Sequence, residues 1–115
     1  MNAVAIVLIA IVAALHVGFL VLEMFLWTKP VGRRIFRLSA AEAQASEVLA
    51  ANQGLYNGFL ATGLIWSLVI DDRPVATFFL ACIAVAGIYG ALTVNRRVFF
   101  VQALPALVAL VVMWI

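Results

Sequence analysis

The chain has 115 residues, of which 68% are hydrophobic and only 10% are charged, and its mean hydropathy is +1.23. Soluble domains have an apolar share of roughly 45 to 50%, so this composition excludes an ordinary soluble protein and indicates an integral membrane protein. The net charge of +2 is small, and we expect no nucleic-acid partner.

A membrane-spanning helix needs about 20 mostly apolar residues. Four such stretches follow one another, separated by short polar breaks, at residues 2–27, 46–70, 75–94 and 98–115. They occupy almost the whole chain, so we predict a single domain, residues 1–115. Its fold class is then an all-α membrane protein, with four transmembrane helices in an antiparallel bundle.

Basic residues are divided unequally between the predicted loops. The loops at residues 28–45 and 95–97 hold six of the seven lysines and arginines, whereas the loop at 71–74 holds only Arg73. Because loops rich in lysine and arginine stay on the cytoplasmic side of a membrane, loops 28–45 and 95–97 should be cytoplasmic. Both termini then lie on the outer side.

The first cytoplasmic loop has its own helix signals. Pro30 can open a short helix in which apolar residues alternate with arginines, a pattern suited to an anionic lipid surface. Ser39 and Glu42 then form an S-x-x-E capping box, in which each side chain bonds a backbone N–H at a helix start. We therefore expect the second long helix to begin near Ala40.

Two ionisable residues, His16 and Glu23, lie in the first predicted span and point the same way along a heptad-like stripe. An ionised carboxylate inside a membrane is costly, so Glu23 should be either protonated or paired with a cation or with amide donors. One interpretation is a salt bridge that only locks the loops; the other is a functional site. The arginines available for such a bridge are Arg33, Arg34, Arg96 and Arg97.

The second predicted span carries four polar side chains where hydrocarbon is expected, and they are Asn52, Gln53, Tyr56 and Asn57. At about 100° per residue, Gln53 and Asn57 share one polar face of the helix, with the other two on its flank. Gly54 and Gly58 lie on the adjoining face, where G-x-x-x-G spacing permits a close helix contact. Polar groups inside a span mark either a binding site or a specific helix pairing.

Depth brings several of these residues together. Counted from the cytoplasmic helix ends at about 1.5 Å per residue, Glu23 lies roughly 6 Å and Gln53 roughly 10 Å into the membrane. His16 and Asn57 both lie roughly 16 Å in. The third and fourth spans add Tyr89 and Gln102 in the same half, and Pro105 should kink the fourth helix and free a carbonyl.

Because these polar residues all lie in the cytoplasmic half of the predicted spans, we predict a cavity that is open to the cytoplasm and closed on the outer side. Its predicted ligand-binding residues are His16, Glu23, Asn52, Gln53, Tyr56, Asn57, Tyr89 and Gln102.

The chain has one histidine and one cysteine, Cys82. A structural zinc site within one chain needs four such ligands as a rule, so we predict no metal site. Cys82 has no intramolecular disulfide partner and is interpreted as a packed thiol. The sequence identifies no cofactor.

The pattern from His16 to Glu23 and Trp27, together with residues 52–61 (NQGLYNGFLA), resembles a family of small four-span bacterial membrane proteins. This family is domain of unknown function number thirteen hundred and four, and the likeness covers essentially the whole chain. The resemblance implies a multi-pass protein of the bacterial cytoplasmic (inner) membrane, but it carries no activity over to this chain.

Two other four-span families bear a partial likeness. Small multidrug-resistance transporters also have a glutamate in the first helix, but theirs lies deeper than Glu23. The membrane-associated eicosanoid and glutathione superfamily is closer in layout, with outward termini, a long first cytoplasmic loop and polar residues low in the second helix. Its characteristic second-helix arginines are absent here, so the likeness concerns architecture more than ligand.

Three functions remain open. The leading hypothesis is an oligomeric bundle that binds or transports a small polar or amphiphilic molecule, with membrane lipid and further copies of the chain as its partners. The second is a membrane enzyme acting on a lipid or thiol substrate, for which only His16, Glu23 and Tyr56 could serve as catalytic groups. The third is a structural or accessory membrane subunit, whose polar cluster specifies helix pairing.

Overall fold

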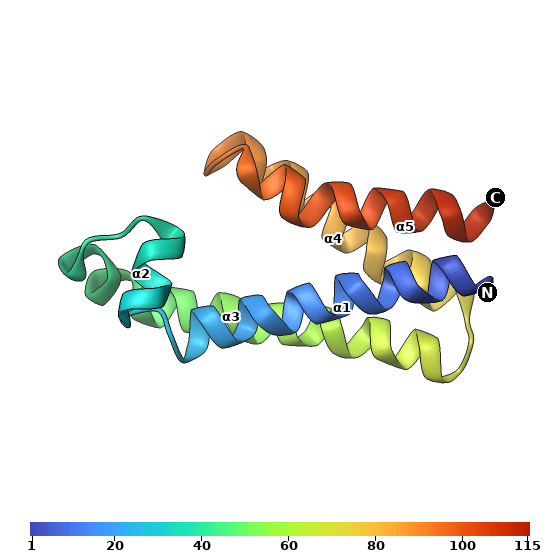
Figure 1. Ribbon diagram of the computed structural model, residues 1–115, viewed down its shortest axis with the longest axis horizontal. Coiled ribbons are helices and arrows are strands. Elements are labelled where there is room, and N and C mark those ends of the chain that lie inside the picture. The colour runs from blue at the N-terminus through green and yellow to red at the C-terminus, as the bar shows by residue number, and fades with distance from the viewer. The chain divides into compact units, whose positions relative to one another are not determined.

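The computed structural model describes all of residues 1–115 and contains helices and no strands (Figure 1). In chain order the helices are α1 (Ala3–Met24), α2 (Pro30–Phe36), α3 (Ala40–Val69), α4 (Arg73–Thr93), the π-helix η1 (Phe99–Ala103) and α5 (Leu104–Trp114). The predicted all-helical fold is thus confirmed, and the long helices coincide with the four apolar stretches.

The chain forms two compact units. The terminal unit consists of Met1–Ala14 and Leu60–Ile115, and the loop unit consists of Leu15–Phe59. The long helices α1 and α3 each contribute to both units, so the units do not coincide with single helices. The expectation of one domain stays a prediction.

Two helices, α1 and α4, are long and apolar enough to cross a membrane. The fourth apolar stretch forms a shorter helical segment, Phe99–Trp114. Helix α3 has 30 residues, but its amide run and its two glutamates make it less apolar than α1. By length and composition, α1 and α4 are therefore the two helices that could cross a membrane.

Helix α2 and the start of α3 form as the local signals predict. Pro30 lies in the first turn of α2, which ends where Arg37 takes a left-handed conformation with φ of 55°. Ahead of α3, the Ser39 N–H donates to Glu42 Oε1 at 3.0 Å, and the Glu42 N–H donates to Ser39 Oγ at 3.1 Å. Both bonds of the capping box are present, so α3 begins at Ala40 as predicted.

The capping box gives stability a pH dependence that can be measured. The bond from the Ser39 backbone, followed by the bond to its side chain, lowers the pKa of Glu42. A carboxylate whose pKa is lower in the folded state stabilises that state above its unfolded pKa, and this contribution is lost as pH falls through the folded pKa. We expect Glu42→Gln to melt at a lower temperature than the wild type at pH 7, with a gap that closes in acid. Equal gaps at pH 7 and pH 3 in thermal melts of the detergent-solubilised protein would contradict this.

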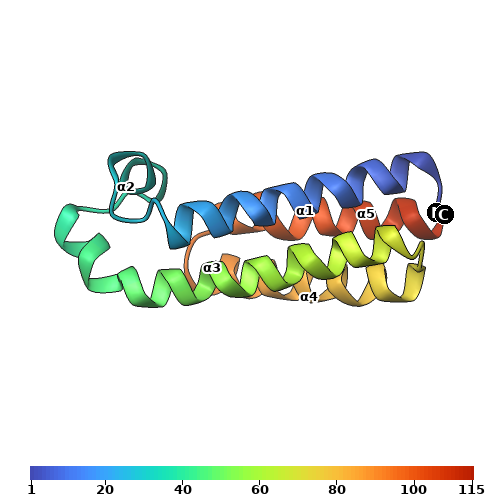
Figure 2. The ribbon, with the colours of Figure 1, turned by 90° about the horizontal axis from the view of Figure 1, so that it is seen from below.

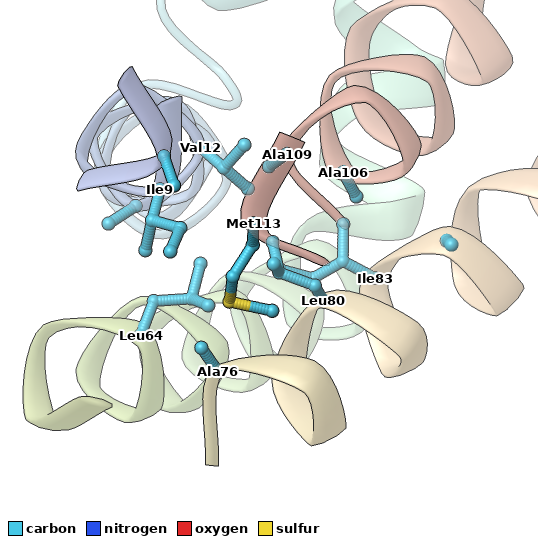
Figure 3. Packing of buried hydrophobic residues seen from close by; sticks show 12 residues of the cluster. Ile9, Val12, Leu64, Ala76, Leu80, Ile83, Ala106, Ala109 and Met113 are labelled. Atoms are coloured by element: carbon cyan, nitrogen blue, oxygen red, sulfur yellow. The ribbon is translucent and has the colours of Figure 1, made fainter. Parts of the chain in front are cut away.

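The terminal unit has a continuous apolar core (Figure 3). Ile9 from α1, Leu64 from α3, Leu80 from α4 and Met113 from α5 point toward one another and are almost completely buried. Small residues such as Ala106 fill the remaining positions, so the helices approach closely.

Polar contacts close the end of the terminal unit where both chain termini lie (Figures 1 and 2). The amino group of Met1 forms an ion pair with Asp71 at 2.9 Å, and the Trp114 indole N–H donates to Thr77 Oγ1 at 2.9 Å. The guanidinium of Arg73 lies 5.3 Å from the ring centre of Trp114. These contacts join the first two turns of α4 to the end of α5, and they also join the α3–α4 turn to the N-terminus.

Pro105 is preceded by a π-helical turn, which is wider than a turn of α-helix, and not by a simple kink. It has no N–H to donate to the carbonyl four residues earlier, and its ring crowds that carbonyl. The preceding residues, Phe99–Ala103, form a π-helical turn, and the Leu104 N–H donates to the Phe99 carbonyl, five residues back. One extra residue in the turn thus takes up the strain that proline introduces.

Candidate functional site

Helices α1 and α3 approach closely within the loop unit because α3 presents glycines to α1. A Cβ on Gly54 would lie 2.7 Å from Met24 Cγ and 3.1 Å from Glu23 Cβ, and a Cβ on Gly58 would lie 2.6 Å from Leu20 Cδ1. These distances are shorter than ordinary carbon contacts, so a larger residue would push the helices apart. The close helix contact predicted from the G-x-x-x-G spacing is present.

Asn57 lies on this same face of α3 and reaches Glu23. Its Nδ2 donates to Glu23 Oε1 at 2.5 Å. Asn57 is only 4% exposed, whereas Glu23 is half-buried. Of the partners that the sequence left open for Glu23, the structure shows an amide donor. Neither Arg33 nor Arg34 forms an ion pair with this carboxylate.

The register of the two helices differs from the one expected from depth. The sequence placed Asn57 level with His16, but Asn57 lies level with Glu23, about two helical turns further along α1. The reason is that the depth estimate counted from assumed membrane boundaries, whereas the packing of Gly54 and Gly58 sets the actual register.

The Glu23–Asn57 pair has more acceptors than donors. The side-chain oxygen of Asn57, Oδ1, is buried and has no hydrogen-bond partner. A buried polar atom without a partner costs about 1–3 kcal/mol, and buried polar atoms are therefore nearly always satisfied. The pair thus contains a carboxylate and an amide oxygen that could each accept a further hydrogen bond.

His16 is completely buried on α1, and its ring stands edge-on to Phe19, with ring centres 5.1 Å apart. It lies two helical turns before Glu23. This setting is that of a packed histidine, and its predicted role in ligand binding stays a prediction.

The other three predicted site residues of α3 are not buried against α1. Asn52 and Gln53 are exposed, and Tyr56 is 51% exposed with its ring against Phe59, 5.9 Å between centres. Helical periodicity predicted that Gln53 and Asn57 share one polar face, but in the structure Asn57 is buried and Gln53 is exposed. Within the loop unit, the buried residues of α3 are the small residues Ala43, Ala50 and Gly54 together with Asn57.

Tyr89 and Gln102 belong to the terminal unit. Tyr89 is 68% exposed on α4, and Gln102 is buried within the π-turn η1. Their membership of one site with Glu23 stays a prediction. A shallow depression of about 240 Å³ in this unit is lined by Leu107, Val108, Val111 and Val112 of α5 and has no polar lining, so it does not coincide with the predicted polar residues.

Side-chain contacts tie the segment between α1 and α3 to the beginning of α3. The Trp27 indole N–H donates to Ser46 Oγ at 3.0 Å, and its ring packs on Phe36, with centres 4.6 Å apart. Gly32 of α2 lies directly against the Leu26 carbonyl. No spacing in the sequence predicts the bond by which Trp27 ties the loop to α3.

The whole chain resembles proteins that have no assigned activity. The family described as "Protein of unknown function (DUF1304)" matches residues 10–114. The "Uncharacterized protein YpaA" of Lactococcus lactis subsp. lactis (strain IL1403) is 30% identical over 115 residues, covering 96% of this chain and 97% of the relative. No solved structure matches the chain. The residues that suggested the resemblance, from His16 to Trp27 and from Asn52 to Ala61, lie within the matched range, and the chain belongs to the DUF1304 family of proteins of unknown function.

Proposed function

We propose that this chain is a four-span protein of the bacterial inner membrane that binds a small polar or amphiphilic molecule at Glu23 and Asn57. Helices α1 and α4 have the length and composition to span a membrane. The unequal division of basic residues supports cytoplasmic loops at 28–45 and 95–97 and outward termini. Glu23, next to the last residue of α1, then lies at the cytoplasmic side.

The observation that carries the binding proposal is the incomplete pairing of Glu23 and Asn57. A purely structural pair would satisfy its buried atoms, yet Asn57 Oδ1 has no donor. Glu23 is half-buried, so a molecule can reach the carboxylate from outside the helix pair. A ligand donor would satisfy both oxygens and remove the cost of the unpaired acceptor.

The proposal is tested by identifying small molecules that copurify with the protein. We expect mass spectrometry of small molecules extracted from the purified full-length protein to show a compound that is lost from Glu23→Gln. The isosteric variant removes the carboxylate charge and keeps the side-chain shape. Its control is Glu47→Gln, which changes an exposed carboxylate of α3 in the same unit and should retain the compound.

Equal melting temperatures and elution profiles of the three proteins would show that the loss is not caused by unfolding. If wild type and Glu23→Gln carry the same compounds in the same amounts, the pair is structural and the chain is better described as an accessory subunit.

A homo-oligomer is part of this proposal. Asn52, Gln53 and Tyr56 form an exposed polar strip on α3, and amide side chains both donate and accept hydrogen bonds. Two copies of the strip could therefore satisfy each other, and the exposed apolar side chains around it suit contact with membrane lipid. The enzyme hypothesis gains no support, because Tyr56 is half exposed with its ring against Phe59 and forms no hydrogen bond with Glu23 or Asn57.

A further inference from the structure

We infer that the molecule bound at Glu23 and Asn57 presents a primary ammonium group attached to an apolar body. This inference rests on the proposed function and adds the chemical class of the ligand. It follows from the donors and acceptors of the site, from the lack of an ion pair between the carboxylate and any cation of the loop unit, and from the apolar residues around it.

The donors and acceptors of the pair define what a ligand must supply. The only side-chain donor of the two residues, Asn57 Nδ2, gives one of its two N–H groups to Glu23 Oε1. The side-chain oxygens left over are Glu23 Oε2 and Asn57 Oδ1, which is buried and has no partner, and both are acceptors. A carboxylate or phosphate ligand would bring further acceptors and leave Oδ1 unpaired, whereas a primary ammonium has three N–H donors.

Charge points the same way. No side chain of the loop unit forms an ion pair with Glu23, although Lys29, Arg33 and Arg34 belong to that unit. A carboxylate that is partly removed from water is stabilised by a nearby cation as well as by amide donors, and here the ligand would supply the cation. A bare divalent ion fits poorly, because Ca²⁺ takes roughly six to eight oxygen ligands and Mg²⁺ about six.

The surroundings of the carboxylate are apolar. Leu20 and Met24 pack beside it at the glycines of α3. Val21 and Phe25 on the same stretch of chain are 40% and 65% exposed, so they offer an apolar surface outside the helix pair. An alkyl chain attached to the ammonium could lie along this surface while the head group reaches the two oxygens.

Three probes with the same alkyl chain separate the contributions of charge and of N–H donors. They are decylamine, which is charged and donates; decyltrimethylammonium, which is charged and has no N–H; and decanol, which is neutral. Binding of each isotope-labelled probe is measured by equilibrium dialysis against the full-length protein in phosphatidylcholine nanodiscs, after subtraction of uptake by empty nanodiscs.

We expect decylamine to bind the wild type most tightly. Glu23→Gln and Asn57→Leu should each weaken its binding roughly tenfold or more, because the first removes the negative charge opposite the ammonium and the second removes a hydrogen-bond acceptor of the ammonium. Glu47→Gln should bind as the wild type does. Glu23→Gln keeps the side-chain shape, so it remains informative even if Asn57→Leu fails to fold.

Each alternative result overturns a stated part of the inference. If decyltrimethylammonium binds as tightly as decylamine, the argument from N–H donors is wrong. If decanol binds as tightly and still depends on Glu23, the ammonium class is wrong while the proposed site stands. If Glu23→Gln binds all three probes as the wild type does, the ammonium assignment fails, and loss of a cellular compound from the same variant would show whether the site itself survives.

Discussion

Replacing Gly87 by alanine is expected to lower the free energy of unfolding by about 3 kcal/mol, the upper end of the usual cost of overpacking. A Cβ at this position of α4 would lie 2.5 Å from the backbone nitrogen of Ala103 and 2.7 Å from its Cβ. The obstacle is mainly backbone within the π-turn η1, which cannot move aside as a flexible side chain can. Helix propensity alone would favour alanine by about 1 kcal/mol, so the predicted sign is opposite to that of propensity.

The matched control is Gly18→Ala. Gly18 also lies within a long apolar helix, α1, but a Cβ there meets nothing within 4 Å. We expect this variant to be as stable as the wild type or more stable, because only the helix propensity changes. The stability of both variants is measured by thermal melts in detergent, followed by circular dichroism. Equal stability of the Gly87 and Gly18 variants would mean that α4 and η1 do not pack as described.

Replacing Gly32 by alanine is expected to detach α2 from the turn before it. The new Cβ would lie 1.9 Å from the Leu26 carbonyl oxygen and 2.7 Å from its carbon, so one backbone segment must move. That movement would loosen the packing of Phe36 on Trp27 and the bond from Trp27 to Ser46. The effect should be local, because these contacts all lie in the loop unit.

Limited digestion with trypsin detects this change, since α2 contains Arg33 and Arg34 and a protease needs a locally unfolded segment. We expect faster cleavage in α2 of Gly32→Ala than of the wild type, with Gly18→Ala as the control. Cleavage of all three proteins at the same rate would show that Gly32 is not clamped against Leu26.

Local sequence signals were sufficient to predict the helices and several of their ends. Apolar stretches of sufficient length predicted the long helices, and Ser39 with Glu42 predicted the start of α3, because capping depends only on residues a few positions apart. Pro30 and Pro105 marked a helix start and a helix irregularity for the same reason. The family resemblance was likewise contained in short runs of residues.

The candidate site required the tertiary structure. The helical periodicity predicted Gln53 and Asn57 on one polar face, and the estimated depth in the membrane placed Asn57 level with His16. The face that packs is decided by which residues let the backbones approach, and Gly54 and Gly58 rotate α3 so that Asn57 alone of its amides points at α1.

The sequence by itself thus determined the helical class, the helix caps and the residue types that could form a polar site, because these depend on composition and on neighbours in the chain. The tertiary structure alone decided which of those residues meet. The Glu23–Asn57 bond joins residues 34 positions apart, and the packing of small side chains between two helices sets their register.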